Sequence, residues 1–267
     1  MSRLPYKLLA VATFALLHLS IAHAKDDEVE AGAQPGATAE EIALAIQTLS
    51  DDLRKPSSTA FSPADVRAWV DKAKSAYGNL RTENGQVDIS YDIVIQAGHY
   101  KRSQGRTGGE GRHVIEQDMS AWVGKMLSEN LKARGYKALL IDADHYAKGM
   151  KPRIFLALHT DSSALPCRLG PSVGYDSVSD SDGMHAIALA LALTMAADPT
   201  EFMKDSYTSG LKSYYAFADM NVSEFEGVLE MAELSCPPDE EKLLSRAEVL
   251  ADNLAVAVVF ALKEPFQ

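Results

Sequence analysis

Short apolar runs alternate with longer helical patterns from residue 88 to the end of the chain. The runs are typical of buried strands, and the segments between them repeat their apolar positions with a helical period. The predicted strands lie at residues 91–97, 136–141, 153–158, 172–176, 212–217 and 226–230. The predicted helices lie at residues 114–134, 183–197 and 239–262. This alternation predicts an α/β protein, with a twisted, mostly parallel sheet of about six strands flanked by helices.

Two further helical patterns precede this region. They cover residues 38–54 and 62–80, and Ser62 stands at the start of the second as a candidate N-cap. The turn-rich link KPSSTAF between them predicts an N-terminal helical hairpin. We therefore divide the chain into an N-terminal helical segment, residues 38–87, and a main domain, residues 88–267. The simpler interpretation is that the hairpin packs on the main domain, and a regulatory or targeting element is the alternative.

The first 24 residues have the pattern of a secretory signal peptide. Arg3 and Lys7 precede the apolar run LLAVATFALLHLSIA, which runs into Ala-His-Ala, a cleavage signal of the A-x-A type. Because the run is too short and poorly flanked for a spanning helix, we expect cleavage after Ala24 and no stable membrane insertion afterwards. The sequence thus predicts an exported protein, most simply a periplasmic one. Residues 25–37 are acidic and rich in small residues, which predicts a disordered leader.

The composition is acidic, with a formal net charge of −11. Loss of the two cations Arg3 and Lys7 with the signal peptide takes this charge to −13. Such a surface is poorly suited to nucleic acid, whose binding depends on Lys and Arg at phosphates, so we expect no nucleic-acid partner. Cys167 and Cys236 are too few for a disulfide scaffold. In an exported protein they could form one bridge, and the sequence leaves their pairing open.

Three residues at the ends of predicted elements are suited to binding a metal ion. The run IVIQAGHY, residues 93–100, brings a predicted strand to its end at His99, and IFLALH ends in His159. Glu116 opens a long helical pattern. Ligands of α/β proteins bind at the carboxyl ends of parallel strands, so these side chains can converge. Two His and one Glu with an open position form a catalytic zinc arrangement, and the pattern predicts a metallohydrolase.

A zinc hydrolase also needs a carboxylate beside the bound water. This base takes a proton from the water and later passes it to the leaving amine. Glu230 ends the apolar segment GVLE and is one candidate. Glu224, Glu226 and Glu233 lie nearby, and spacing alone does not separate the four.

Four segments resemble a known enzyme family in their order along the chain. They are IVIQAGH, GRHVIEQDMSAWVGKMLSENLKARGYKALLID, IFLALHTDSS and VLEMAELSCPPDEEKLL. Together they resemble the zinc-dependent N-acetylmuramoyl-L-alanine amidases of the type called amidase 3, over roughly residues 91–262. The resemblance implies hydrolysis of the amide between N-acetylmuramic acid and L-alanine, with peptidoglycan as the partner. Whether a protein activator takes part stays open.

The resemblance extends to individual residues. It implies that zinc is held by His99, Glu116 and His159. The family's catalytic glutamate lies six residues before the Asn of a Ser-Asn-Pro segment, and Cys236 stands at that Asn position here. Six residues before Cys236 is Glu230, so the resemblance favours Glu230 over Glu233 as the catalytic residue.

The chain departs from the family on either side of the Ala-Gly-His segment. Gln96 stands where Asp is usual, and Tyr100 stands where Gly is usual. Two alternatives to the amidase therefore stay open. One is a zinc peptidase or amidase that acts on another cell-wall or acylated-amino-acid amide. The other is an inactive, wall-binding regulatory homologue.

The loop KRSQGRTGGEGR after His99 is basic in an otherwise acidic chain. Such a loop beside the site could bind carboxylates of a substrate, and a solvated flexible loop is the alternative. The candidate substrate-binding residues are Arg102, Arg106 and Arg112. His113, three residues before Glu116, is a weaker alternative metal ligand.

Overall fold

The structure is a computed structural model that describes residues 61–175, 181–195 and 213–262. The predicted signal peptide, the leader and the helix at residues 38–54 lie outside these ranges. The predicted hairpin is therefore described only in its second helix. Within the described ranges, no helix is both long enough and apolar enough to cross a membrane.

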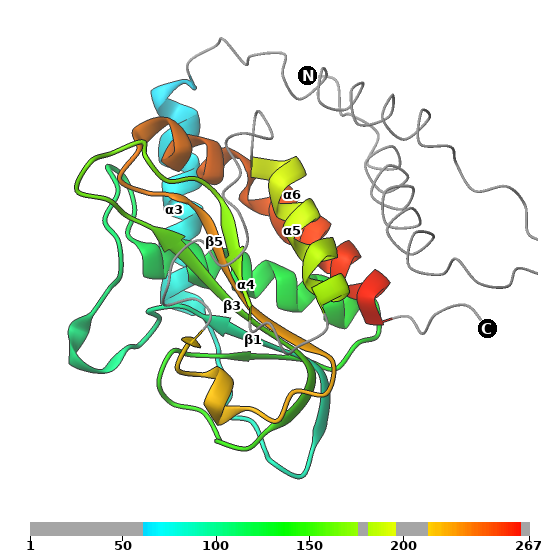
Figure 1. Ribbon diagram of the computed structural model, residues 1–267. Coiled ribbons are helices and arrows are strands. Elements are labelled where there is room, and N and C mark those ends of the chain that lie inside the picture. The colour runs from blue at the N-terminus through cyan, green and yellow to red at the C-terminus, as the bar shows by residue number, and fades with distance from the viewer. Residues whose placement is uncertain (1–60, 176–180, 196–212, 263–267) are drawn as a thin grey trace, which may run out of the picture. The chain divides into compact units, whose positions relative to one another are not determined.

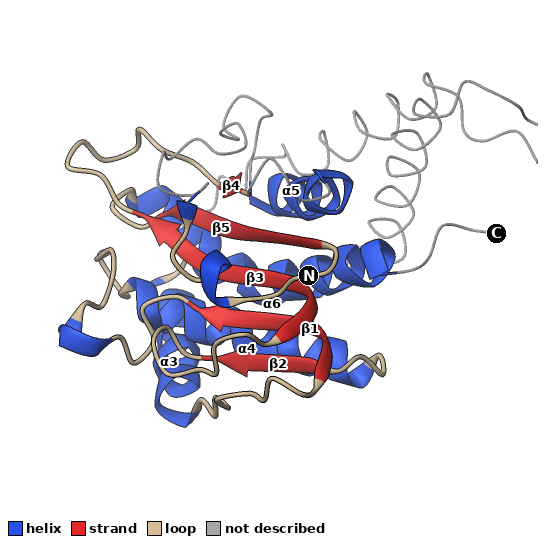
Figure 2. Ribbon diagram, turned by 60° about the horizontal axis from the view of Figure 1, so that its bottom comes forward, coloured by secondary structure: helices blue, strands red, loops and turns tan. Residues whose placement is uncertain are grey.

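In the part of the chain that the structure describes, five strands form one sheet in the order β2-β1-β3-β5-β4. Their bounds are Ser90–Ala97 for β1, Ala138–Ile141 for β2, Lys151–Asp161 for β3, Ser172–Gly174 for β4 and Phe225–Glu233 for β5. β1 pairs in parallel with β2 and β3, and β3 pairs in parallel with β5. Only the short β4 is antiparallel, on the outer side of β5 (Figure 2). The prediction of a mostly parallel sheet is confirmed.

The fifth predicted strand, residues 212–217, is wrong for the part that the structure describes. From residue 213 the chain forms turns and then the short 3-10 helix η4, Phe217–Asp219. Ala216 is buried against one face of the sheet, and the ring of Phe217 meets that of Phe155 edge-on, with centroids 6.2 Å apart. The apolar run therefore reflects burial on a sheet face, which a strand pattern alone does not distinguish from pairing within the sheet.

Four helices complete the described fold (Figure 1). They are α3, Pro63–Asn79; α4, Glu116–Ala133; α5, Ser181–Met195; and α6, Pro237–Leu262. α4 packs on β1, β2 and β3, while α6 contacts β5 and lies between α4 and α5. α3 packs against α4 and α6 and begins where the sequence predicts, because the Ser62 hydroxyl accepts the Asp65 N–H at 3.2 Å. The helical layer therefore anchors α4, whose first residue belongs to the predicted site.

The two faces of the sheet are covered differently. Side chains alternate between the faces along each strand, so Ile93, Ile95 and Ala97 of β1 join one core cluster with residues of all four helices. Val94, Phe155 and Val228 belong to a second cluster, which is closed by loop residues around 146–150 and 214–222. We call this second side the loop-covered face. This face matters for function because the strand residues His159 and Glu230 project from it.

Candidate metal centre

Gly98 and His99 follow β1 directly, and the backbone changes direction there. The Gly98 N–H donates to the carbonyl oxygen of Leu158 at 3.0 Å, so the pairing of β1 with β3 continues to this residue. His99 then adopts a φ of 57°, in the left-handed region that few non-glycine residues occupy. A Cβ atom on Gly98 would lie 2.7 Å from Nε2 of His159 and would also meet the Leu158 oxygen. Glycine therefore allows the ends of these two strands to approach.

We expect Gly98→Ala to disturb the site and the fold together. The added methyl group would push His159 aside, and overpacking of this kind typically costs about 1–3 kcal/mol of unfolding free energy. Zinc affinity should fall as well, measured by competition with a chromophoric chelator, while urea unfolding reports stability. Gly78→Ala is the matched control, because a Cβ atom there meets nothing within 4 Å. A Gly98→Ala protein with wild-type stability and zinc affinity would show that the close approach is unimportant.

β3 and β5 bring His159 and Glu230 side by side. The two residues are direct partners in the register of the parallel strands. They project from the loop-covered face, because Ala157 and Val228, two residues earlier, belong to its cluster. His159 is 6% exposed and Glu230 is 8% exposed, so both are largely withdrawn from water.

Glu116 reaches the same place from the first turn of α4. Its Oε2 accepts the Gly109 N–H at 2.8 Å, and its Oε1 accepts the Thr160 N–H at 3.1 Å. The N-terminal end of the helix also favours a negative charge there. Burial acts to raise the pKa of Glu116, but the hydrogen bond and charge of His159, the charge of His99 and the Gly109 N–H bring it below its usual value. Glu116 is therefore held as a carboxylate, the form that binds metals.

The structure thus brings together the three residues predicted to bind the metal. One nitrogen or oxygen atom from each of His99, Glu116 and His159 lies within 4.8 Å of the other two. His159 Nδ1 is 2.8 Å from Glu116 Oε1, and His99 Nε2 is 3.6 Å from Glu116 Oε2. The centroids of the two imidazole rings are 5.2 Å apart. This group could hold a single metal ion.

The chemistry of the three residues fits zinc. Two imidazole nitrogens and one carboxylate oxygen are a donor set of catalytic zinc sites. His99 Nδ1 lies 3.1 Å from the carbonyl oxygen of Arg106 and can donate to it, which leaves the Nε2 lone pair for the metal. Burial lowers the pKa of His99, against the opposing effect of Glu116. His99 is therefore favoured as the neutral imidazole that a metal requires.

Two more carboxyl groups, Glu230 and Asp161, surround this group. Burial, followed by the charges of Asp161 and Glu116, raises the pKa of Glu230 well above its usual value. Burial, followed by Glu116 and Glu233, raises the pKa of Asp161 to about 6. Within the described ranges, Glu230 Oε2 and Asp161 Oδ2 are buried without a hydrogen-bond partner. A divalent cation held by the three ligands would offset this accumulation of buried negative charge.

The surroundings separate the four candidate glutamates that the sequence left together. Glu233 is fully buried, and its two oxygens accept three backbone N–H groups and the Ser235 hydroxyl. Glu224 pairs with the Arg153 guanidinium. Glu226 lies four residues before Glu230 on β5, about 13 Å along the strand. Glu230 is the one that lies beside His159 with an oxygen left for another partner.

Sequence analysis missed Tyr214 and did not assign a role to Gln96. The Tyr214 hydroxyl lies 2.9 Å from His159 Nε2 and donates to Gln96 Oε1 at 2.6 Å. The available signals were the Tyr214-Tyr215 pair and the unusual Gln96 itself. Tyr100, the other departure from the family, has a different role, since its hydroxyl donates to the carbonyl oxygen of Leu80 after α3 at 3.3 Å.

The three arginines predicted to bind substrate have different surroundings. Arg102 stacks over the ring of Tyr215, 4.8 Å from its centroid, and pairs with Asp144 at 3.5 Å. Arg106 contacts His99 through its backbone carbonyl group. Arg112 instead lines a cavity beside α3, together with His113, and His113 Nε2 lies 3.8 Å from a carboxylate oxygen of Glu241 on α6. His113 is not among the three clustered metal-binding candidates.

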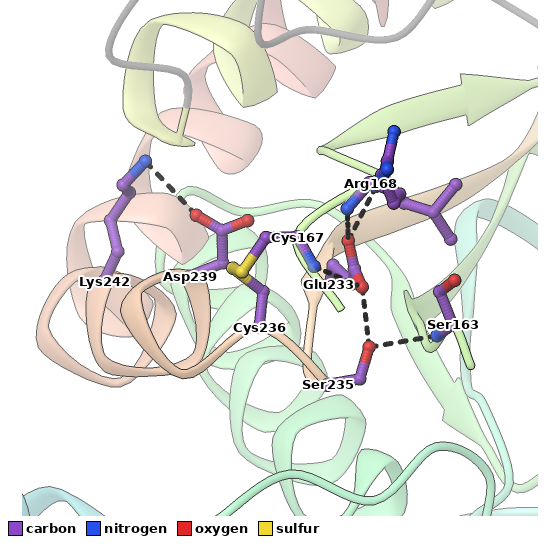
Figure 3. The surroundings of a disulfide bond; sticks show 9 residues. Ser163, Cys167, Arg168, Glu233, Ser235, Cys236, Asp239 and Lys242 are labelled. Carbon is purple, nitrogen blue, oxygen red and sulfur yellow. Dashed lines mark hydrogen bonds and ion pairs between the residues drawn. A yellow bond between two sulfur atoms is a disulfide. The ribbon is translucent and has the colours of Figure 1, made fainter. Parts of the chain in front are cut away.

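A disulfide lies beside the end of β5. Cys167 and Cys236, whose pairing the sequence left open, are bonded, with their Cα atoms 4.7 Å apart (Figure 3). The bond joins the loop after β3 to the residue that precedes α6. Beside it, Glu233 accepts the N–H groups of Cys167 and Arg168 at 2.9 and 2.8 Å. The loop is thus tied to the end of β5 by a covalent bond and by a buried carboxylate.

Similarity to known proteins is found among solved structures. No family model matches the chain, and no curated protein matches it. Among solved structures, the N-acetylmuramoyl-L-alanine amidase AmiC2 of Nostoc punctiforme is similar at 13% identity, over 66% of this chain and 98% of that chain, with a TM-score of 0.47.

Two further structures are similar to the same degree. The catalytic domain of CwlV, an N-acetylmuramoyl-L-alanine amidase from Bacillus (Paenibacillus) polymyxa, is 15% identical over 63% of this chain and 96% of that chain, with a TM-score of 0.44. The CwlD amidase from Clostridioides difficile, in complex with the GerS lipoprotein, is 15% identical over 64% of this chain and 95% of that chain, with a TM-score of 0.46. The first two are named as N-acetylmuramoyl-L-alanine amidases and the third as an amidase. At such identities and TM-scores we draw no function from them.

Proposed function

We propose that this protein is a zinc-dependent amidase that hydrolyses the bond between N-acetylmuramic acid and L-alanine in peptidoglycan. The observation that carries the proposal is the meeting of His99, Glu116 and His159 with Glu230 at one edge of the sheet. The choice of substrate rests on the four sequence motifs and their order along the chain. The predicted export of the chain agrees with a substrate outside the cytoplasm.

Zinc would be held by His99, Glu116 and His159. Bound there, it supplies a water molecule of lowered pKa and polarises the amide carbonyl group. The residues that form the site do the rest. Glu116 is held in position by the Gly109 and Thr160 N–H groups, and the ring of His99 is oriented by the Arg106 carbonyl oxygen. Held this way, the side chains need little rearrangement during the reaction.

Glu230 would carry the proton between the two halves of the reaction. As the water oxygen bonds to the carbonyl carbon, one water proton moves to the Glu230 carboxylate. As the carbon–nitrogen bond breaks, the same proton moves to the nitrogen that becomes the free amine of L-alanine. The buried position of Glu230 raises its pKa, which suits a group that must take up and release a proton. No covalent bond to the protein is required.

Arg102 would assist by binding a carboxylate of the stem peptide. It stacks on Tyr215, the neighbour of Tyr214, and its partner Asp144 is partly exposed. A guanidinium held over an aromatic ring keeps donors free for a second carboxylate. Arg106 remains a candidate for the same role, whereas Arg112 lies beside α3 and is a weaker one.

The test uses the full chain without its first 24 residues, cell-wall sacculi and mass spectrometry of the released fragments. We expect one zinc ion per chain and release of stem peptides that begin with a free L-alanine amine. A chelator should stop the release, and added zinc should restore it. Shortened muropeptides would instead indicate another amide as the substrate. Zinc binding without release from any wall fraction would indicate a regulatory homologue, and protein that takes up no zinc would refute the metal site.

A further inference from the structure

We propose that Tyr214 and Gln96 position His159 for metal binding, through a hydrogen-bonded relay that holds Nε2 and leaves Nδ1 for the metal. The inference rests on the proposed zinc site and concerns how one of its ligands is oriented. It assigns a role to a residue from a loop, Tyr214, and to the position in β1 where the chain departs from the family pattern.

The two nitrogens of His159 face different partners. Nδ1 lies 2.8 Å from Glu116 Oε1 and so points toward the candidate ligand group. Nε2 lies 2.9 Å from the Tyr214 oxygen, on the other side of the ring. A neutral imidazole carries a proton on only one nitrogen, and a metal-bound histidine usually donates its other N–H to an outer partner. A metal at Nδ1 would replace the hydrogen that this nitrogen shares with Glu116, and the remaining ring hydrogen, on Nε2, would then donate to Tyr214.

The partners of Tyr214 determine which groups donate and which accept in the relay. The Tyr214 O–H donates to Gln96 Oε1 at 2.6 Å, so its oxygen retains lone pairs for the His159 N–H. The Gln96 amide is itself oriented, because its Nε2 donates to the carbonyl oxygen of Ala143 at 3.2 Å and to the Tyr215 hydroxyl at 3.3 Å. Tyr215 also donates to that carbonyl. Each hydrogen-bond donor in the relay thus meets an acceptor.

These hydrogen bonds explain why an amide at position 96 suits the relay. A carboxylate there could accept from Tyr214, but it has no hydrogen to donate to the Ala143 carbonyl oxygen. Gln96 is 0% exposed, so water cannot replace a missing partner. A carboxylate oxygen in the place of Nε2 would face the Ala143 carbonyl oxygen without a hydrogen between them, and a buried charge there costs free energy, which makes the amide the better residue at this point.

Packing holds the Tyr214 ring where the relay needs it. The ring lies edge-on to that of His159, with centroids 5.4 Å apart, and contacts Tyr215 and Phe217 at 4.6 and 5.6 Å. These contacts do not involve the hydroxyl group. Tyr214→Phe therefore removes the relay and leaves the aromatic packing in place. Because the hydroxyl faces Nε2 and the ligand atoms lie on the Nδ1 side, Tyr214 is a positioning residue.

Three variants of the full chain without its first 24 residues test the relay. We expect Tyr214→Phe and Gln96→Met each to lower zinc affinity by a factor of about 10–100, as measured by competition with a chromophoric chelator. The visible spectrum of the cobalt-substituted protein should change in both. The double variant should lose little more zinc affinity than the single variant that binds zinc more weakly, because both substitutions break the same relay. Tyr91→Phe is the control, since its hydroxyl meets the Gln86 N–H at the opposite end of β1.

Urea unfolding of the metal-free variants separates orientation from a general loss of structure. A purely structural role would lower stability and leave both zinc affinity and the cobalt spectrum at their wild-type values. That result, in Tyr214→Phe or in Gln96→Met, would overturn the relay. If the wild-type protein binds no zinc, the proposed function fails first, and the relay fails with it.

Discussion

Glu230→Gln is expected to lower amide hydrolysis by a factor of about 10²–10⁴, the usual contribution of a general acid–base group. The substitution keeps the size of the side chain and removes its ability to take up a proton. Zinc affinity should stay close to the wild-type value, because Glu230 is not one of the three clustered ligand candidates. Stability should hold or rise, since burial and two neighbouring carboxylates disfavour the charged form of Glu230. Fragment release from sacculi, zinc titration and urea unfolding measure the three quantities.

Two further glutamates, one just before β5 and one at its last residue, serve as controls for this prediction. Glu224→Gln removes an ion pair with Arg153 and should leave turnover unchanged. Glu233→Gln replaces a buried carboxylate that accepts four hydrogen bonds, so it should lower stability before it affects chemistry. If Glu233→Gln abolishes turnover in a protein of wild-type stability, while Glu230→Gln remains active, the assignment of the base is wrong.

Removal of the disulfide should lower the unfolding free energy by about 4 kcal/mol. Cys167 and Cys236 are 69 residues apart in the sequence, so the bond restricts a long loop of the unfolded chain. The double substitution Cys167→Ser with Cys236→Ser avoids an unpaired thiol. Its urea midpoint should fall relative to wild type, and the slope should rise, because the unfolded chain is less compact without the bond. The loss should extend to the loop after β3, whose N–H groups at residues 167–169 bind Glu233.

A reductant provides the matched control for the same bond. It should bring the wild-type protein to the stability of the double variant and leave that variant unaffected. Equal stability of the oxidised and reduced wild-type protein would show that the bond adds nothing to the native state. Zinc affinity should fall less than stability. The two cysteines bond to each other and are not part of the group formed by His99, Glu116 and His159.

Much of the fold could be predicted because its signals are local. The parallel strands that carry His99 and His159 are continuous apolar runs, as expected for strands buried on both faces. The start of α4 at Glu116 and of α3 after Ser62 follow from the residues at those positions. The strand predicted at residues 212–217 is wrong in its described part because an apolar run indicates that a segment is buried and does not indicate what it packs against.

The sequence by itself determined that this chain forms an α/β sheet, and that two histidines and a glutamate stand at strand ends and a helix start. It also singled out Glu230 and Gln96 through a family resemblance. Only the tertiary structure decided which nitrogen of each histidine faces the ligand group, that Glu233 is held by backbone N–H groups, and that Tyr214 reaches His159. Periodicity and end signals act between near neighbours in the chain. Hydrogen-bond partners such as Tyr214 and Gln96, 118 residues apart, are chosen by the packing of distant segments.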